Sequence, residues 1–170
     1  NKETAGGIDH AKSYNIPYAV ISHKDYATKE AFEQAILDAL KYEPVDLICL
    51  AGFMRILSPY FLEQWGRDII SIHPSLLPKH KGLDTHKRAI AAGDKHAGCT
   101  VHYVIPEIDA GNTIVQKTVT ISPKDTEDSL AKKVLAQEHL AYPEAIRLVA
   151  EGKISHTMLK TIKDTPIQNG

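Results

Sequence analysis

Apolar residues recur along the chain with two periods, which predict alternating strands and helices. Short, nearly continuous apolar runs are typical of buried strands, and they occur at 16–21, 45–53 and 68–73. The segment at 27–44 instead repeats its apolar residues with the period of a helix. Thr28 is the predicted N-cap of this helix, and Pro44 ends it.

Two shorter helices are predicted from their end signals. One begins at Pro59, because proline fits the first position of a helix, and ends at Gly66. The other is capped by Asp84 or Thr85 and ends at Gly93. Each lies next to a predicted strand, so strands and helices alternate through this half of the chain.

The pattern changes in the second half. Alternating runs at 98–106 and 113–121, separated by a tip that contains EIDAGN, predict an antiparallel hairpin. The segment at 125–149 predicts a long amphipathic helix, with Asp125 as its cap and Pro143 as a point of bending.

These elements together predict an α/β fold. We expect a Rossmann-like, open and mostly parallel twisted sheet flanked by helices, with the antiparallel hairpin in the C-terminal part. No repeat or linker divides the sequence, so we expect one domain over residues 1–155 and a polar tail at 156–170.

Composition narrows the function. The 170 residues carry a formal net charge of −1, so no general basic field favours nucleic acid or an anionic membrane as a partner. No apolar run approaches the roughly 20 residues of a membrane-spanning helix. Cys49 and Cys99 lie in apolar runs and are predicted to be buried free thiols, which favours a reducing, cytoplasmic location.

Candidate chemistry lies at the strand ends and in the hairpin tip. Ligands bind such sheets outside the carboxyl ends of the strands, where His73 is followed by the stiff Pro74. Asp109 in the hairpin tip is a second candidate. Both have structural alternatives, a histidine satisfied at a strand end and an aspartate that stabilises a turn. His102 reads as a sheet-face histidine, and Arg55 as a residue pointing to the crevice or a solvated loop arginine.

Several other sites are not supported by the sequence. There is no Cys-x-x-Cys or His-Glu-x-x-His motif, and His80 and His86 have no obvious third ligand, so no metal is predicted. The sequence also has no Gly-x-Ser-x-Gly elbow, no Gly-x-Gly-x-x-Gly and no Walker phosphate loop.

Four stretches resemble one family closely. They are LAGFMRILSPYF, IHPSLLPKHKGLDTH, GCTVHYVIPEIDAGNTIVQ and AQEHLAYPEA. They are similar to the glycinamide ribonucleotide transformylases, the folate-dependent formyltransferases of purine synthesis, and the similarity runs from residue 1 to about residue 155. The resemblance implies transfer of a formyl group from 10-formyltetrahydrofolate to the amine of glycinamide ribonucleotide. It also implies small-molecule partners only, with a monomer or a homodimer both open.

The resemblance also implies roles for individual residues. His73 would stabilise the oxyanion, Asp109 would orient that imidazole and help to move a proton, and Ser71 occupies the place of a third catalytic residue. The residues implied for the folate are Met54, Arg55, Leu57, Val104, Ile105, Glu107 and Asp109. The residues implied for the substrate or for support are Pro74 and Ser75 at the formyl site, Glu138 at the ribose, His102 beneath the site, and Pro78, whose bond to Leu77 would be cis.

Two departures from the family keep alternatives open. The family reads Asn-Ile-His-Pro where this chain has Ser71 before Ile72, and a hydroxyl offers one donor where a carboxamide offers two. The chain also begins, without methionine, at a point that falls after the family's N-terminal strand and phosphate loop, so we expect a longer natural protein. The alternatives are a related folate-dependent formyltransferase or hydrolase, or a catalytically impaired folate- or nucleotide-binding variant.

Overall fold

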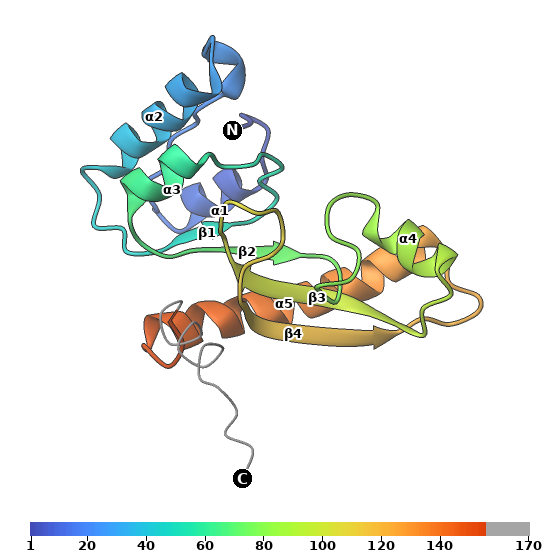
Figure 1. The fold of residues 1–170 in the computed structure, drawn as a ribbon. Coiled ribbons are helices and arrows are strands. Elements are labelled where there is room, and N and C mark those ends of the chain that lie inside the picture. Colours follow the sequence, from blue (N-terminus) through green and yellow to red (C-terminus); the bar gives the residue numbers. More distant parts are fainter. Residues whose placement is uncertain (156–170) are drawn as a thin grey trace. The chain divides into compact units, whose positions relative to one another are not determined.

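The computed structural model describes residues 1–155 of the chain. Its helices and strands are α1 (Gly7–Ser13), the 3-10 helix η1 (His23–Asp25), α2 (Lys29–Leu40), β1 (Ile48–Leu50), α3 (Pro59–Trp65), β2 (Ile69–His73), α4 (Thr85–Ala91), β3 (His96–Tyr103), β4 (Thr113–Thr120) and α5 (Glu127–Ala150). Figure 1 shows these elements in chain order from blue to red. The predicted tail at 156–170 lies outside the described residues.

The chain folds as two compact units, which are described separately. One unit comprises Asn1–Asp46 and Gly52–Arg67, and the other comprises Leu47–Ala51 and the chain from Asp68 onward. The sequence-based expectation of one domain over residues 1–155 stays a prediction.

The first unit is helical, and its ends follow the predicted signals. The Thr28 hydroxyl accepts from the Ala31 amide at 3.1 Å and caps α2. Pro59 opens α3, and Gly66 ends it with a left-handed φ of 63°. The buried Glu33 of α2 accepts from the Ser58 amide at 2.8 Å, which links the two helices.

The prediction of a strand at 16–21 is wrong. This segment forms no strand, and alternate apolar residues in it are exposed to solvent, namely Ile16, Tyr18 and Val20. A strand needs a neighbour for its backbone hydrogen bonds, and none pairs with 16–21 among the described residues. Apolar composition alone therefore misidentified it.

The second unit contains a four-stranded sheet in the order β1-β2-β3-β4. β1 pairs with β2 in parallel, whereas β3 is antiparallel to both β2 and β4. The α/β class and the antiparallel hairpin are confirmed, but the sheet is mixed rather than mostly parallel. The short α4 explains the difference, because its seven residues span only about 10 Å and the chain re-enters the sheet at the end where β2 stops.

One face of this sheet forms the core with α5 (Figure 1). Fully buried residues of α5 pack on it, namely Leu130, Val134, Ala141 and Ala145. They meet Ile70 of β2 and Val101 of β3, which are also completely buried. α5 begins one residue later than predicted, because Thr126 forms a capping box with Ser129 while Asp125 accepts from the Ser122 amide outside the helix.

The edge strand β1 is shorter and more exposed than predicted. Only Ile48–Leu50 of the segment 45–53 forms a strand. Cys49 is a free thiol as predicted but is exposed, whereas Cys99 is free and buried. The cause is the position of α5, which lies mainly over β3 and β4. No helix within residues 1–155 is long and apolar enough to cross a membrane.

Candidate active site

Four polar side chains lie on the sheet face opposite α5, and the strand register determines their places. His73 of β2 is paired with Thr100 of β3, and Ser71 with His102. Because side chains alternate between the two faces of a strand, residues 71 and 73 share a face with 100 and 102. The sheet therefore brings two histidines and two hydroxyls together from distant parts of the sequence.

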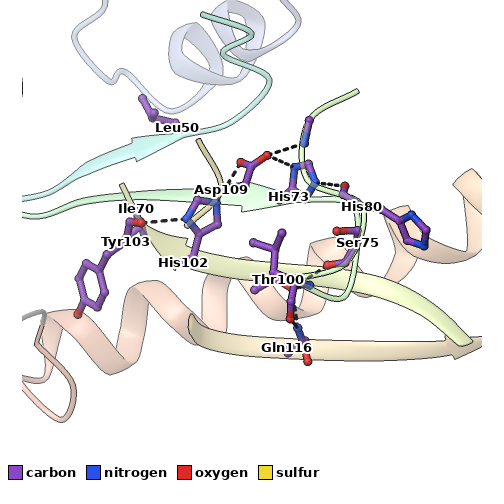
Figure 2. Close-up of polar contacts among 12 residues, drawn as sticks. Leu50, Ile70, His73, Ser75, His80, Thr100, His102, Tyr103, Asp109 and Gln116 are labelled. Carbon is purple, nitrogen blue, oxygen red and sulfur yellow. Dashed lines mark hydrogen bonds and ion pairs between the residues drawn. The ribbon is translucent and has the colours of Figure 1, made fainter. Parts of the chain in front are cut away.

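Asp109 lies between the two histidines (Figure 2). Its Oδ2 is 3.4 Å from Nδ1 of His73, and its Oδ1 is 3.6 Å from Nε2 of His102. Oδ2 also accepts from the Gly82 amide at 2.9 Å. The predicted convergence of His73 and Asp109 on one place is thus present in the structure.

The loop that carries Asp109 is tightly determined. Asp109 has a φ of 49°, a left-handed conformation that costs about 1 kcal/mol or more for a residue other than glycine. A Cβ at Gly111 would lie 1.7 Å from the Tyr103 carbonyl oxygen, so only glycine allows the chain to return to β4 at this distance. The Tyr103 amide then donates to the Asn112 carbonyl at 3.0 Å and closes the loop.

Both ring nitrogens of His73 face acceptors. Nε2 lies 3.0 Å from the backbone carbonyl of His80, and a carbonyl can only accept, so Nε2 carries a proton. Nδ1 faces the Asp109 carboxylate at a distance that suits an ion pair better than a full hydrogen bond. With both nitrogens protonated, the buried ring can donate at one end to the His80 carbonyl and at the other to a group beside Asp109.

His102 is held in a different state. Its Nδ1 lies 2.9 Å from the Tyr103 carbonyl and therefore carries a proton. Burial lowers the pKa of His102, opposed by the hydrogen bond to Tyr103 and by the charge of Asp109. In the neutral ring the lone pair of Nε2 faces Asp109, so this pair can share one proton.

The loop after His73 is fixed by hydrogen bonds from the sheet. The Thr100 hydroxyl donates to the Ser75 carbonyl at 2.7 Å and accepts from the Leu77 amide at 3.1 Å. Gln116 of β4 donates to the Thr100 hydroxyl at 2.8 Å and to the Leu77 carbonyl at 3.1 Å. The Leu77–Pro78 bond is cis, as the resemblance implied. The roles of Thr100 and Gln116 were not predicted, because only the strand register reveals them.

The other residues of this unit that were predicted to bind the folate or the substrate differ in their exposure to solvent. Ser71, Pro74, Val104 and Ile105 are half-buried, Ser75 is buried, and Glu107 is exposed. Glu138 of α5 is half-buried, and burial raises the pKa of its carboxyl, opposed by the charges of His139 and His73. Their roles at a folate or a ribose stay predictions.

Three further residues implied for the folate belong to the first unit. Leu57 is buried there, Met54 is exposed, and the Arg55 guanidinium lies over the Phe32 ring at 5.7 Å. Their part in a folate site stays a prediction. Among residues 1–155, no three His, Cys, Asp or Glu side chains are arranged to hold a metal ion.

Comparison with known proteins identifies the family. The model of the formyl transferase family matches residues 1–146 of the chain. The chain belongs to the formyl transferase family.

Curated relatives and solved structures are similar over most of the chain. The trifunctional purine biosynthetic protein adenosine-3 of Chironomus tentans is 49% identical over 91% of this chain, which spans only 11% of that protein. The phosphoribosylglycinamide formyltransferase of Haemophilus influenzae is 42% identical, and the chain spans 73% of it. The structure of glycinamide ribonucleotide transformylase 1 from Symbiobacterium toebii is 39% identical with a TM-score of 0.86, covering 91% of this chain and 73% of that one.

Proposed function

We propose that the protein transfers the formyl group of 10-formyltetrahydrofolate to the amine of glycinamide ribonucleotide in purine biosynthesis. The observation that carries the proposal is the pairing of His73 with Asp109 at 3.4 Å, where β2 ends and the hairpin loop returns. The relatives named above for the same reaction support the choice of substrates. The two free thiols support a cytoplasmic location, and the oligomeric state stays open between monomer and homodimer.

The chemistry of this transfer matches the charges at the site. The lone pair of the substrate amine attacks the formyl carbon, and the carbonyl electrons move to the oxygen. His73 donates from Nδ1 to this oxyanion, while its Nε2–H continues to donate to the His80 carbonyl. Preorganised donors of this kind lower the barrier because they need no rearrangement when the charge develops.

The attacking amine must then lose a proton. The Asp109 carboxylate accepts it, directly or through a water, and His102 can share it because its neutral Nε2 faces the same carboxylate. The tetrahedral intermediate collapses as its oxygen re-forms the carbonyl. The bond from carbon to the folate nitrogen breaks, and that nitrogen takes up the proton.

The test is formyl transfer by the purified chain with both substrates present. We expect His73→Ala to lower kcat by about 10²–10³-fold, as for loss of one oxyanion donor, with a small change in folate affinity. His10→Ala, at an exposed histidine of α1, is the matched control and should retain activity. Equal losses of turnover and folate affinity in His73→Ala would contradict the assigned role.

Ser71 favours a second candidate, a folate-binding protein or hydrolase with weak transfer. Its hydroxyl is shorter than the family's carboxamide, so it reaches less far towards a developing oxyanion. Release of formate without acceptor would indicate the hydrolase. Folate binding without either reaction would indicate the binding protein.

A further inference from the structure

The backbone carbonyl that holds His73 is itself in an unfavourable conformation. The contact of His80 with His73 is made by its backbone and not by its side chain. The His80 carbonyl oxygen accepts a hydrogen bond from Nε2 of His73 at 3.0 Å. The φ of His80 is 53°, in the left-handed region that residues other than glycine rarely adopt. Since that conformation directs the carbonyl, something must stabilise it against relaxation.

The side chain of His80 provides that stabilisation through Asp94. Its Nε2 lies 2.7 Å from Oδ2 of Asp94, and both side chains are largely buried, with 18% and 14% of their surfaces exposed. Lys79 reaches the other carboxylate oxygen, Oδ1, at 2.9 Å, but its side chain is 65% exposed. The two contacts lower the pKa of Asp94, with the hydrogen bond from His80 as the larger cause.

Asp94 is rigidly placed. It follows Gly93, which has a φ of 67°, and its amide donates to the Ala89 carbonyl of α4 at 3.1 Å. The Asp94 carboxylate is therefore anchored to the end of α4. The loop residue that it contacts, His80, lies outside any helix or strand. Figure 2 shows the His80 ring directed away from His73 while its carbonyl is directed towards it.

We propose that Asp94 and His80 act as positioning residues, which fix the His80 carbonyl and through it the orientation and protonation of the His73 ring. The inference rests on the proposed function for its kinetic consequence only. Holding the proton on Nε2 leaves Nδ1 as the nitrogen that faces Asp109 and the reacting group. A ring released from this carbonyl can rotate, and its Nδ1 donor then points away from the oxyanion.

The test uses the full chain with Asp94→Ala and His80→Ala. We expect each to lower kcat about tenfold, the effect of one net hydrogen bond, with the KM for the folate changed less than about twofold. Asp94→Asn and His80→Gln keep a partial contact and should recover most of kcat, which a merely structural defect would not predict. Lys79→Gln is the matched control, because it removes the exposed partner of Asp94 but leaves the contact with His80, and it should retain activity.

A spectroscopic measurement detects the effect of Asp94 and His80 on the His73 ring without requiring turnover. The imidazole N–H signals in ¹⁵N-edited NMR spectra should show a protected Nε2 proton on His73 in the unaltered chain and in Lys79→Gln. This proton should exchange rapidly in Asp94→Ala and His80→Ala. If the NMR change appears but the unaltered chain transfers no formyl group, the proposed function fails and the positioning stands. An unchanged His73 signal in Asp94→Ala, or an equal loss of kcat in Lys79→Gln, overturns the inference.

Discussion

Replacing Thr100 with valine removes the hydroxyl that joins the sheet to the loop after His73. The side chain is completely buried, and valine has nearly the same shape, so the substitution changes hydrogen bonding with little change in packing. The Ser75 carbonyl loses its donor, and the Leu77 amide loses its acceptor. The amide of Gln116 also loses a partner, but this side chain is exposed and can bond to water.

The magnitude follows from the two backbone groups. A buried donor or acceptor left without a partner costs about 1–3 kcal/mol. Ser75 is buried and Leu77 half-buried, so the sum is about 3 kcal/mol of unfolding free energy. For a chain of this size that corresponds to a fall in melting temperature of roughly 6–12 °C. Turnover should fall as well, because Thr100 is paired with His73 across the sheet.

The assay is urea unfolding followed by far-UV circular dichroism, with two control substitutions. Thr100→Ser keeps the hydroxyl and loses only a methyl group, for which we expect about 1 kcal/mol. Thr118→Val makes the same chemical change at an exposed position of β4 and should alter stability by less than about 0.5 kcal/mol. If Thr100→Val is no less stable than Thr100→Ser, the hydroxyl does not anchor the loop and the reasoning is refuted.

Three further predictions follow from the same site. Gly111→Ala forces a Cβ to within 1.7 Å of the Tyr103 carbonyl, so we expect about 3 kcal/mol of destabilisation in denaturant unfolding, and an unchanged midpoint would contradict the close approach. Burial lowers the pKa of His102 in the folded chain below the ordinary histidine value of about 6.5. Below that pH the unfolded chain therefore binds more protons than the folded chain, and stability should decrease as the pH falls. Unfolding measured from pH 7.5 down to about 5 should show a smaller slope in His102→Asn, and an equal slope would exclude this linkage. Ser71→Asn should raise kcat, by about tenfold or more if the carboxamide adds an oxyanion donor, and the refuting result is no gain in formyl transfer.

The places of His73 and Asp109 in the fold could be predicted because their signals are local. An apolar run that ends in His73 and is followed by proline identifies the carboxyl end of a strand from a few neighbouring residues. Two alternating runs around EIDAGN place Asp109 at the tip of a hairpin. The resemblance to a family then supplied the expectation that the two meet. The register of β2 and β3 places His73 beside β3, and the bond from the Gly82 amide holds the Asp109 carboxylate next to it.

Features that depend on strand order could not be predicted from local sequence patterns. Alternating strands and helices suggested a mostly parallel sheet. A parallel β3 would need a connection long enough to return to the start of β2, and the connection contains only the short helix α4. The segment 16–21 has strand-like composition, yet a strand forms only where a second strand offers its backbone groups. Cys49 is exposed for a similar reason, since burial of a strand's face depends on where α5 packs.

The polar contacts around His73 show why a site is harder to derive than a fold. Thr100 and Asp94 belong to no motif. Thr100 bonds to a backbone group of the loop between β2 and α4, and Asp94 contacts the same loop through the His80 side chain. That loop has few hydrogen bonds of its own, so its shape depends on side chains supplied by β3 and by the end of α4. A histidine at a strand end becomes a directed donor only when a carbonyl holds one nitrogen and a carboxylate faces the other. The chemistry proposed for His73 therefore depends on residues that no local sequence pattern identifies, and substitutions at those residues are the sharpest test of the proposal.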